Sequence, residues 1–142
     1  MKKNNARSEA PSAAAYFKEA NRFYKNAKQI LSQANIEYNR YLDAKPVQES
    51  AGVAYLAMLK AIDGFLIENG VSTDELPTSM TEYQKALKKF SARNGKVLAA
   101  FNTAYENLHI FAYYRRGLGV KLVKEGFDSV KFVIERLSGH KI

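Results

Sequence analysis

Cysteine and tryptophan are absent from this 142-residue chain, and proline occurs only three times. Without cysteine the protein can form no disulfide bond, bind no metal through a thiolate and use no thiol as a nucleophile. No uninterrupted apolar run approaches the roughly 18–20 residues that a membrane span requires. The basic first residues are not followed by the apolar segment of a signal peptide, so we expect a cytoplasmic protein that makes no contact with a membrane.

Motifs for catalysis and metal binding are also scarce. The chain has two histidines, His109 and His140. The segment from Glu106 to His109 matches the Glu-x-x-His motif of di-iron bundles once, whereas those sites need a second copy and two further glutamates. No phosphate-binding Gly-x-x-x-x-Gly-Lys motif is present, and no local signature marks a serine or threonine nucleophile. We therefore predict no metal and no cofactor, and we assign no catalytic residue.

Positive charge predominates, with 22 lysines and arginines against 14 acidic residues and a net charge of +8. A basic balance favours anionic partners, nucleic acid first among them, although lysines that only coat helices give the same excess. The basic residues concentrate in one short segment, which contains Lys85, Lys88, Lys89, Arg93 and Lys96. We take Lys89, Arg93 and Lys96 as candidate nucleic-acid-binding residues.

Apolar residues recur three and four positions apart almost throughout the chain, which is the period of an amphipathic helix. No segment shows the alternation that is typical of a strand. Short connections between long helices favour antiparallel neighbours, so the sequence predicts an all-α, up-and-down bundle of about five helices without a sheet. We expect a single bundle domain over residues 13–138, with a flexible tail at residues 1–12 and a short tail at residues 139–142.

The first two predicted helices differ in their apolar surfaces. The first carries a single apolar stripe between residues 13 and 34. After a break at residues 35–46, the second helix has Pro46 in its first turn and Gly70 as its left-handed cap. This helix is rich in alanine and apolar over much of its circumference, so we predict that it is the central one. The residues that we expect in the core are Met58, Phe65, Phe101 and Leu108.

Three further helices are expected in the second half of the chain. The third begins at a capping box, in which the Ser79 hydroxyl and the Glu82 carboxylate can satisfy each other's backbone N–H groups. The fourth spans residues 96–116 and ends at the glycine that follows. The fifth spans residues 120–137, and Gly126 weakens it by up to about 1 kcal/mol relative to alanine, which would allow its first turn to form a separate piece.

The segment YENLHIFAYYRR, which starts at Tyr105, combines a histidine with three tyrosines and two arginines. Tyr105, His109 and Tyr113 are four residues apart and share one helix face, with Arg116 one turn further. One interpretation is a histidine–tyrosine seam packed against a neighbouring helix. The other is a ligand-binding groove made by the same residues, in which Arg115 and Arg116 bind phosphate while the tyrosines stack on a base.

Two stretches resemble HEPN domains, the higher-eukaryote and prokaryote nucleotide-binding helical bundles. AYLAMLKAIDGFLIENG, at residues 54–70, resembles the alanine- and tyrosine-rich second helix, which a glycine closes. YENLHIFAYYRRGLGVKLVKEGFDSVKFVIERL, at residues 105–137, resembles the later pair, in which an aromatic and arginine-bearing helix end precedes the last helix. The resemblance extends over residues 13–137 and implies a helical bundle that often dimerises.

Many HEPN members are ribonucleases, or partners of nucleotidyltransferases in toxin–antitoxin and defence systems. Catalytic members carry an arginine, usually followed by a polar residue, and a histidine after four to six intervening positions. Arg93 and Asn94 resemble the first half of that motif, but no histidine stands at the required distance, and His109 has no arginine at the matching positions before it.

The resemblance therefore implies a non-catalytic HEPN-like module that serves protein interaction, and we expect it to form a homodimer, the commonest closed assembly. The alternative from another class is a nucleic-acid- or nucleotide-binding protein of a toxin–antitoxin or nucleotidyltransferase-associated system. A nucleotidyltransferase would then be its protein partner.

Overall fold

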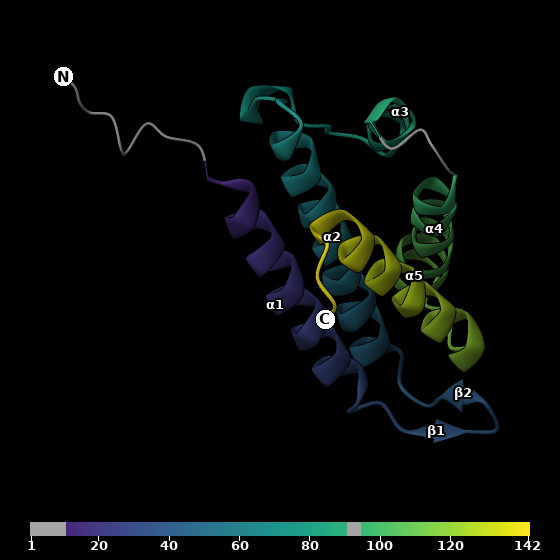
Figure 1. Ribbon diagram of the computed structural model, residues 1–142. Helices are drawn as coiled ribbons and strands as arrows, with labels where there is room; N and C mark the ends of the chain where they lie inside the picture. The colour runs from purple at the N-terminus through teal and green to yellow at the C-terminus, as the bar shows by residue number, and fades with distance from the viewer. Residues whose placement is uncertain (1–10, 91–94) are drawn as a thin grey trace.

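The computed structural model describes residues 11–90 and 95–142 of the chain. Its secondary structure is mostly helical, so the predicted all-α class is confirmed (Figure 1). The helices are α1 (Ala13–Leu31), α2 (Ala44–Glu68), α3 (Met80–Phe90), α4 (Lys96–Ala104) and α5 (Val120–Ser138), with a 3-10 turn η2 (Thr73–Glu75) and a π-helix η3 (Tyr105–Tyr114). Two short strands, β1 (Ile36–Glu37) and β2 (Arg40–Tyr41), follow α1.

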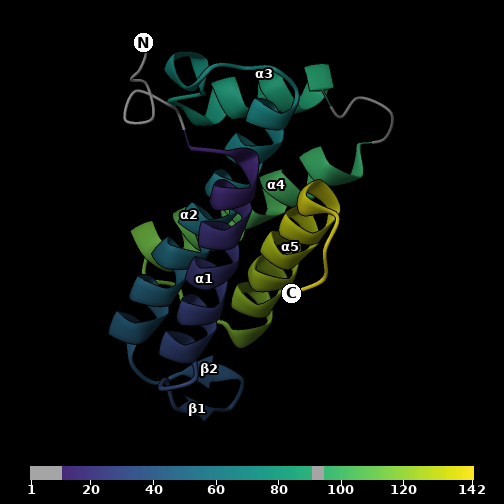
Figure 2. The ribbon, with the colours of Figure 1, turned by 60° about the vertical axis from the view of Figure 1, so that its left-hand side comes forward.

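The long helices lie side by side, and the short helix α3 lies across one end of them. In Figure 1, α1 and α2 run antiparallel, α5 crosses in front of α2, and α4 with η3 lies behind α5. Figure 2 shows α3 running across the top of this group rather than along it. The up-and-down arrangement therefore holds for α1, α2, α5 and the α4–η3 rod, whereas α3 departs from it.

Helix α2 occupies the centre of the molecule, as the sequence predicts. It contacts α1, α5, η3 and α3, and its buried side chains include Ala51, Ala54, Ala57 and Ala61. These small residues allow neighbouring helices to approach closely. Helix α1 lies close to α2 at Gly64, where a Cβ atom would lie 2.9 Å from the Cβ atom of Tyr16 and 3.2 Å from the carbonyl oxygen of Ala13.

Among the described residues, α2 is also the one helix whose length and composition would permit it to cross a membrane. Half of its most apolar window is buried against the rest of the fold. The central helix of a soluble protein meets the same two criteria, because it too is apolar on several sides. The burial of α2 is explained by its neighbours α1, α5 and η3.

The ends of α2 use the residues that the sequence marks. Pro46 lies in the first turn, and the side chain of Asp43 caps it by accepting a hydrogen bond from the backbone N–H of Lys45 at 3.1 Å. At the other end Gly70 is left-handed, with φ 93°. The N–H of Val71 donates to the carbonyl of Leu66 at 3.0 Å, which is the long bond of a Schellman motif. Both predicted ends are confirmed.

The predicted capping box of α3 is present in a modified form. The backbone N–H of Glu82 donates to the Ser79 hydroxyl at 3.2 Å, as expected. The Glu82 carboxylate, however, accepts from the backbone N–H of Thr78 at 2.7 Å rather than from Ser79. The carboxylate thus satisfies a donor one residue earlier, which lengthens the capped segment.

A two-stranded hairpin replaces part of the break that the sequence predicts between the first two helices. Ile36 pairs with Tyr41 across a turn in which Tyr38 and Asn39 have φ values of 54° and 63°. Two consecutive positive φ angles define the type I′ turn that suits a tight hairpin. The N–H of Tyr41 donates to the carbonyl of Leu118 at 2.9 Å, which ties the hairpin to the segment before α5. Strands of two residues are too short for an alternating pattern to reveal them.

Two glycines have roles that differ from the predicted ones. The left-handed residue after η3 is Arg116, with φ 57°, and not Gly117. Gly117 is required for space, because a Cβ atom there would lie 2.4 Å from Cζ of Phe111. Gly126 does not divide the last helix, since α5 is continuous. A Cβ atom at Gly126 would lie 2.6 Å from Cγ of Leu108, so this glycine allows α5 to pack against η3.

The core agrees with the sequence prediction at three of the four residues. Met58, Phe101 and Leu108 are fully buried. Phe65 packs against the core but is only partly buried. Gly64 and Leu66 take the buried positions on either side of it, because the inward face of α2 turns toward α1 at this level.

Truncation of Phe101 tests this core. The Phe101→Ala variant should lose about 3–5 kcal/mol of unfolding free energy, because a fully buried aromatic side chain leaves a cavity that neighbours fill only in part. Urea denaturation of both proteins gives the value. Leu122→Ala on α5 is the matched control, since Leu122 is 40% exposed, and it should lose much less. A loss below 1 kcal/mol for Phe101→Ala would contradict the assigned inward face.

Candidate functional site

Four ring side chains form a continuous aromatic stack between η3 and α2. The rings of Tyr105 and His109 lie 5.4 Å apart at 28°, and those of His109 and Tyr113 lie 6.0 Å apart at 9°. Tyr55 of α2 stacks on His109 at 5.0 Å and 26°. We call Tyr55, Tyr105, His109 and Tyr113 the aromatic stack. The structure therefore brings together three of the predicted ligand-binding residues and adds Tyr55 from a helix distant in sequence.

The π-helical geometry of η3 helps to align this stack. A π-helix joins each backbone N–H to the carbonyl five residues earlier, as the N–H of Arg115 does with Ile110 at 2.9 Å. Side chains four and five positions apart therefore lie nearly above one another. Most π-helices are single-turn bulges, and they are frequent at functional sites, whereas η3 continues over ten residues. The sequence predicts one α-helix here, because both helix types place residues four apart on one face.

An apolar groove lies beside the stack. Its volume is about 400 Å³. The side-chain amide of Gln48 donates to the carbonyl of Tyr113 at 2.9 Å and closes one end. Leu56 and Tyr113 are each 48% exposed. The complete lining of this groove, which we call the apolar groove, is Gln48, Glu49, Gly52, Val53, Tyr55, Leu56, His109 and Tyr113.

The chemistry of the groove suits binding rather than proton transfer. Burial raises the pKa of Tyr55 to about 12, with a smaller contribution from Tyr105, so the phenol stays protonated at neutral pH. His109 is held between ring faces by its three aromatic neighbours. Stacked aromatic pairs of this kind contribute about 0.5–1.5 kcal/mol beyond the burial of their area. The seam that the sequence predicts is therefore present, with part of its surface open to solvent.

The two arginines at the end of this segment do not join the stack. Arg115 and Arg116 follow the last turn of η3 and are exposed. The left-handed backbone of Arg116 costs roughly 1–2 kcal/mol for a residue with a side chain. Within the described part of the chain neither arginine forms an ion pair. Tyr114 beside them is 73% exposed.

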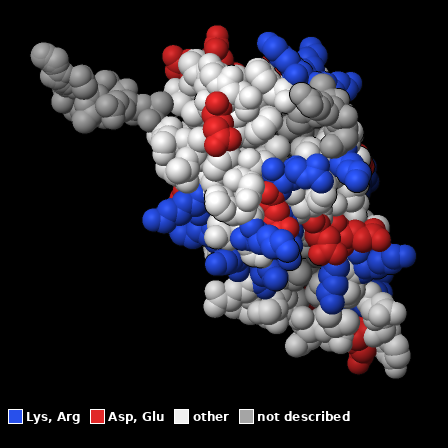
Figure 3. Space-filling model, in the orientation of Figure 1, with Lys and Arg blue, Asp and Glu red and all other residues white. Residues whose placement is uncertain are grey.

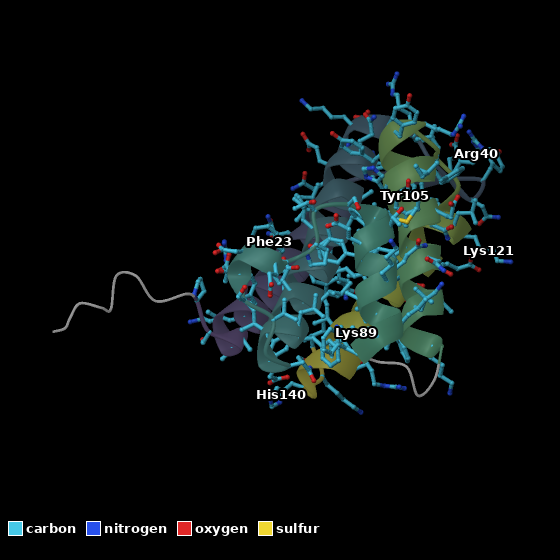
Figure 4. All side chains as sticks on the ribbon, turned by 90° about the horizontal axis from the view of Figure 1, so that it is seen from above. Phe23, Arg40, Lys89, Tyr105, Lys121 and His140 are labelled. Carbon is cyan, nitrogen blue, oxygen red and sulfur yellow. The ribbon has the colours of Figure 1, made fainter. Side chains whose placement is uncertain are left out.

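The predicted nucleic-acid-binding residues lie elsewhere. Lys89 is exposed near the end of α3, with its Nζ atom 5.2 Å from the centre of the Phe90 ring. Lys96 begins α4, and Arg93 lies outside the described residues. Figure 4 shows the labelled Lys89 and Tyr105 well apart on the molecule. Lys89 therefore lies apart from the aromatic stack, on another helix.

One partly buried polar pair was not predicted from the sequence. The hydroxyl of Tyr83 on α3 donates to a carboxylate oxygen of Asp63 on α2 at 2.8 Å. Burial raises the pKa of Asp63 to about 6, and the hydrogen bond from Tyr83 and the charge of Lys60 oppose that rise. The sequence feature that indicates this pair is the single carboxylate within the apolar run AIDGFLI. In the described ranges, no group of three or more histidine, aspartate or glutamate side chains could hold a metal ion.

The fold and the groove define a class: a small five-helix domain with an aromatic, partly open face. The comparison with family models then assigns the chain. It belongs to the family described as Domain of unknown function (DUF5618), whose model matches residues 15–139.

A solved structure, described as a protein of unknown function from Dyadobacter fermentans, has the same fold. It is 27% identical, with a TM-score of 0.75, and the match covers 91% of this chain and 98% of that one. No curated protein matches the chain. The resemblance to HEPN domains is not tested by these matches and stays a prediction.

Substitution of Asp63 tests the buried carboxylate. The folded pKa of about 6 lies above the ordinary value of 3.8, so the folded state binds more protons between these limits. The unfolding free energy of the wild type should then rise as the pH falls from about 6 toward 4. Asp63→Asn removes this titration and keeps an acceptor for the Tyr83 hydroxyl. The unfolding free energy of the variant relative to the wild type should therefore be most favourable above pH 6 and become less favourable below it.

Melting temperatures of both proteins from pH 4 to pH 8 provide the measurement. Asp74→Asn is the control, because Asp74 is exposed on η2. A difference between wild type and Asp63→Asn that stays constant over this range would show that Asp63 is not buried as described.

Proposed function

We propose that this protein is a non-catalytic, HEPN-like helical module of the cytoplasm that acts through protein interaction and forms a homodimer. The apolar groove is its interface. The observation that carries the proposal is the set of half-exposed apolar side chains around a hollow that is lined mainly by aromatic and aliphatic groups. Soluble chains seldom leave such surface uncovered unless it binds something.

The distribution of charge supports a second copy as the occupant of the groove. Two chains that each carry a net charge of +8 repel one another, so they can associate closely only through a face without lysine. The lining of the apolar groove contains no lysine or arginine, and its charged residue is Glu49. Interface cores are likewise depleted of lysine and enriched in tyrosine. Arg115 and Arg116 lie two and three residues after Tyr113 and would supply the complementary charge for Glu49 across a two-fold axis.

The setting of the histidine supports a non-catalytic role. The HEPN ribonuclease motif needs an arginine and a histidine with four to six residues between them, and the sequence contains no such pair. The imidazole of His109 stacks on the rings of Tyr55, Tyr105 and Tyr113, and no arginine stands at the spacing that the ribonuclease motif requires. We therefore assign the imidazole to the lining of the apolar groove and not to a catalytic step.

Leu56→Arg tests the dimer. Wild-type protein at micromolar concentration should scatter light with twice the monomer mass of 16.0 kDa. The variant should dissociate at least about tenfold more readily, because a charge at the centre of an apolar interface loses its hydration. Leu122→Arg is the matched control, since Leu122 is 40% exposed on α5, away from the groove. A wild type of monomer mass, or a Leu56→Arg protein as dimeric as the wild type, would disprove the proposed interface.

A second candidate function rests on the exposed arginines. Arg115 and Arg116 keep free guanidinium groups next to Tyr113 and Tyr114, and both tyrosines are exposed. Guanidinium groups bind phosphate through a planar fork of donors, and exposed tyrosine rings stack on unpaired bases. This surface would bind a nucleotide or single-stranded RNA in a toxin–antitoxin or nucleotidyltransferase-associated system, with a nucleotidyltransferase as the protein partner.

Replacement of both arginines separates the two candidates. If this surface binds RNA, Arg115→Ala/Arg116→Ala should weaken the affinity for a short single strand at least about tenfold and flatten its salt dependence, since fewer counterions are released. The melting temperature should change little, because both side chains are exposed. Lys18→Ala/Lys25→Ala removes the same charge from the exposed side of α1 and is the control. Equal RNA affinity in both double variants would reject the arginine surface as the binding site.

A further inference from the structure

A second cavity, of about 430 Å³, lies between α1, α5 and the hairpin. Its floor is aromatic. Tyr24 and Phe127 are 4% and 5% exposed, and their ring centres are 6.1 Å apart with the planes tilted at 48°. Tyr41 of β2 adds a third ring to the wall. This cavity shares neither a residue nor an element with the apolar groove.

The rim of the cavity is cationic. It carries Lys28 from α1, Lys124 and Lys131 from α5, and one acidic residue, Asp128. The Nζ atom of Lys28 lies 5.7 Å from the centre of the Tyr24 ring. Figure 3 shows lysine and arginine side chains gathered over α1 and α5 on this face, with fewer acidic ones among them. We call this site the lysine cavity.

The lysines at the rim of the lysine cavity form no ion pair with the described residues. In the described part of the chain the ion pair within 4.0 Å is Arg22 with Glu19 on α1, so the three rim lysines have no carboxylate partner there. The hydroxyl of Tyr24 makes no hydrogen bond to the described residues. Burial, and then the charges of Asp128 and Glu135, raises the pKa of Tyr24 to about 12. The phenol of Tyr24, a residue that lines the cavity, is therefore neutral at neutral pH.

We propose that the lysine cavity binds a small amphipathic anion that has a flat apolar body and one acidic group. The body lies against Phe127 and Tyr24, whose side chains line the cavity and offer apolar contact. The acidic group lies at the rim between Lys28 and Lys131, whose ammonium groups bind oxyanions by charge-assisted hydrogen bonds. The volume falls within the range of small-molecule sites. Asp128 disfavours ligands with several negative charges and accepts a hydrogen bond from a ligand donor.

An aromatic sulfonate whose fluorescence rises in apolar surroundings, 1-anilinonaphthalene-8-sulfonate, is a suitable probe. The wild type should bind this probe, and its affinity should fall at higher salt. The neutral analogue N-phenyl-1-naphthylamine should bind at least about tenfold more weakly, because it lacks the acidic group. 1-Naphthoate should displace the probe, whereas decanoate, whose chain is not flat, should displace it at least about tenfold less effectively.

Charge-neutralising variants locate the probe. Lys28→Gln/Lys131→Gln should reduce its affinity at least about tenfold, while Lys85→Gln/Lys88→Gln on α3 should leave it unchanged. All four positions are exposed or partly exposed, and circular dichroism confirms that each variant is folded. The Leu56→Arg variant should keep the affinity, which separates this proposal from the proposed dimer interface.

Three results would each overturn the proposal: a wild type that does not bind the probe, equal affinity for the neutral analogue, or unchanged affinity in Lys28→Gln/Lys131→Gln. Loss of probe binding in Leu56→Arg alone would place the probe in the apolar groove and would also reject the lysine cavity as its site. Equal displacement by decanoate would reject the flat body as the feature that is recognised.

Discussion

The close approach of α1 and α5 to the small residues of α2 is the constraint on which the rest of the structure depends. At Gly64 the backbone of α2 leaves no space for a Cβ atom beside Tyr16 and Ala13. The buried alanines of α2 extend the same narrow surface toward its N-terminus. Because the helices are so close, larger side chains from the neighbours supply the bulk of the core, among them Phe101, Leu108 and Phe127.

Glycine residues also allow close packing where α5 contacts η3. Gly126 allows Leu108 to fit against α5, and Gly117 allows the ring of Phe111 to lie against the loop. On the side of η3 that faces α2, the rings of Tyr105 and His109 contact Tyr55. The two glycines therefore permit the packing of η3 on the side that faces α5, and Tyr55 packs on its ring side chains from α2.

The two candidate surfaces differ in the charge of their lining residues and in the kind of partner that each would bind. The apolar groove between α2 and η3 has no cationic lining residue, and the lysine cavity between α1 and α5 has three. For a chain with a net charge of +8, self-contact would meet least repulsion on a surface of the first kind. The basic residues remain outside such a contact, where they would be available to an acidic ligand. Self-association and anion binding would then proceed on one small domain without competition.

A part of this structure follows from local chemistry, and the sequence predicts that part. The three-and-four spacing of apolar residues determines the five helices, because a helix face repeats at that period whatever lies beyond it. The cap at Gly70 is equally local, since it acts within a few residues of the helix end. The shared face of Tyr105, His109 and Tyr113 also follows from spacing alone.

Contacts between distant residues decided the rest. The strands of the hairpin are too short to leave a pattern, and they are fastened by Leu118, far along the chain. The orientation of α3, the bond from Tyr83 to Asp63 and the position of Tyr55 on His109 each join elements that the sequence keeps apart. The segments that form α1 and α5 both contain lysines. Only the packing of these helices placed Lys28 and Lys131 around one cavity, because a helix period describes one helix and not its neighbour.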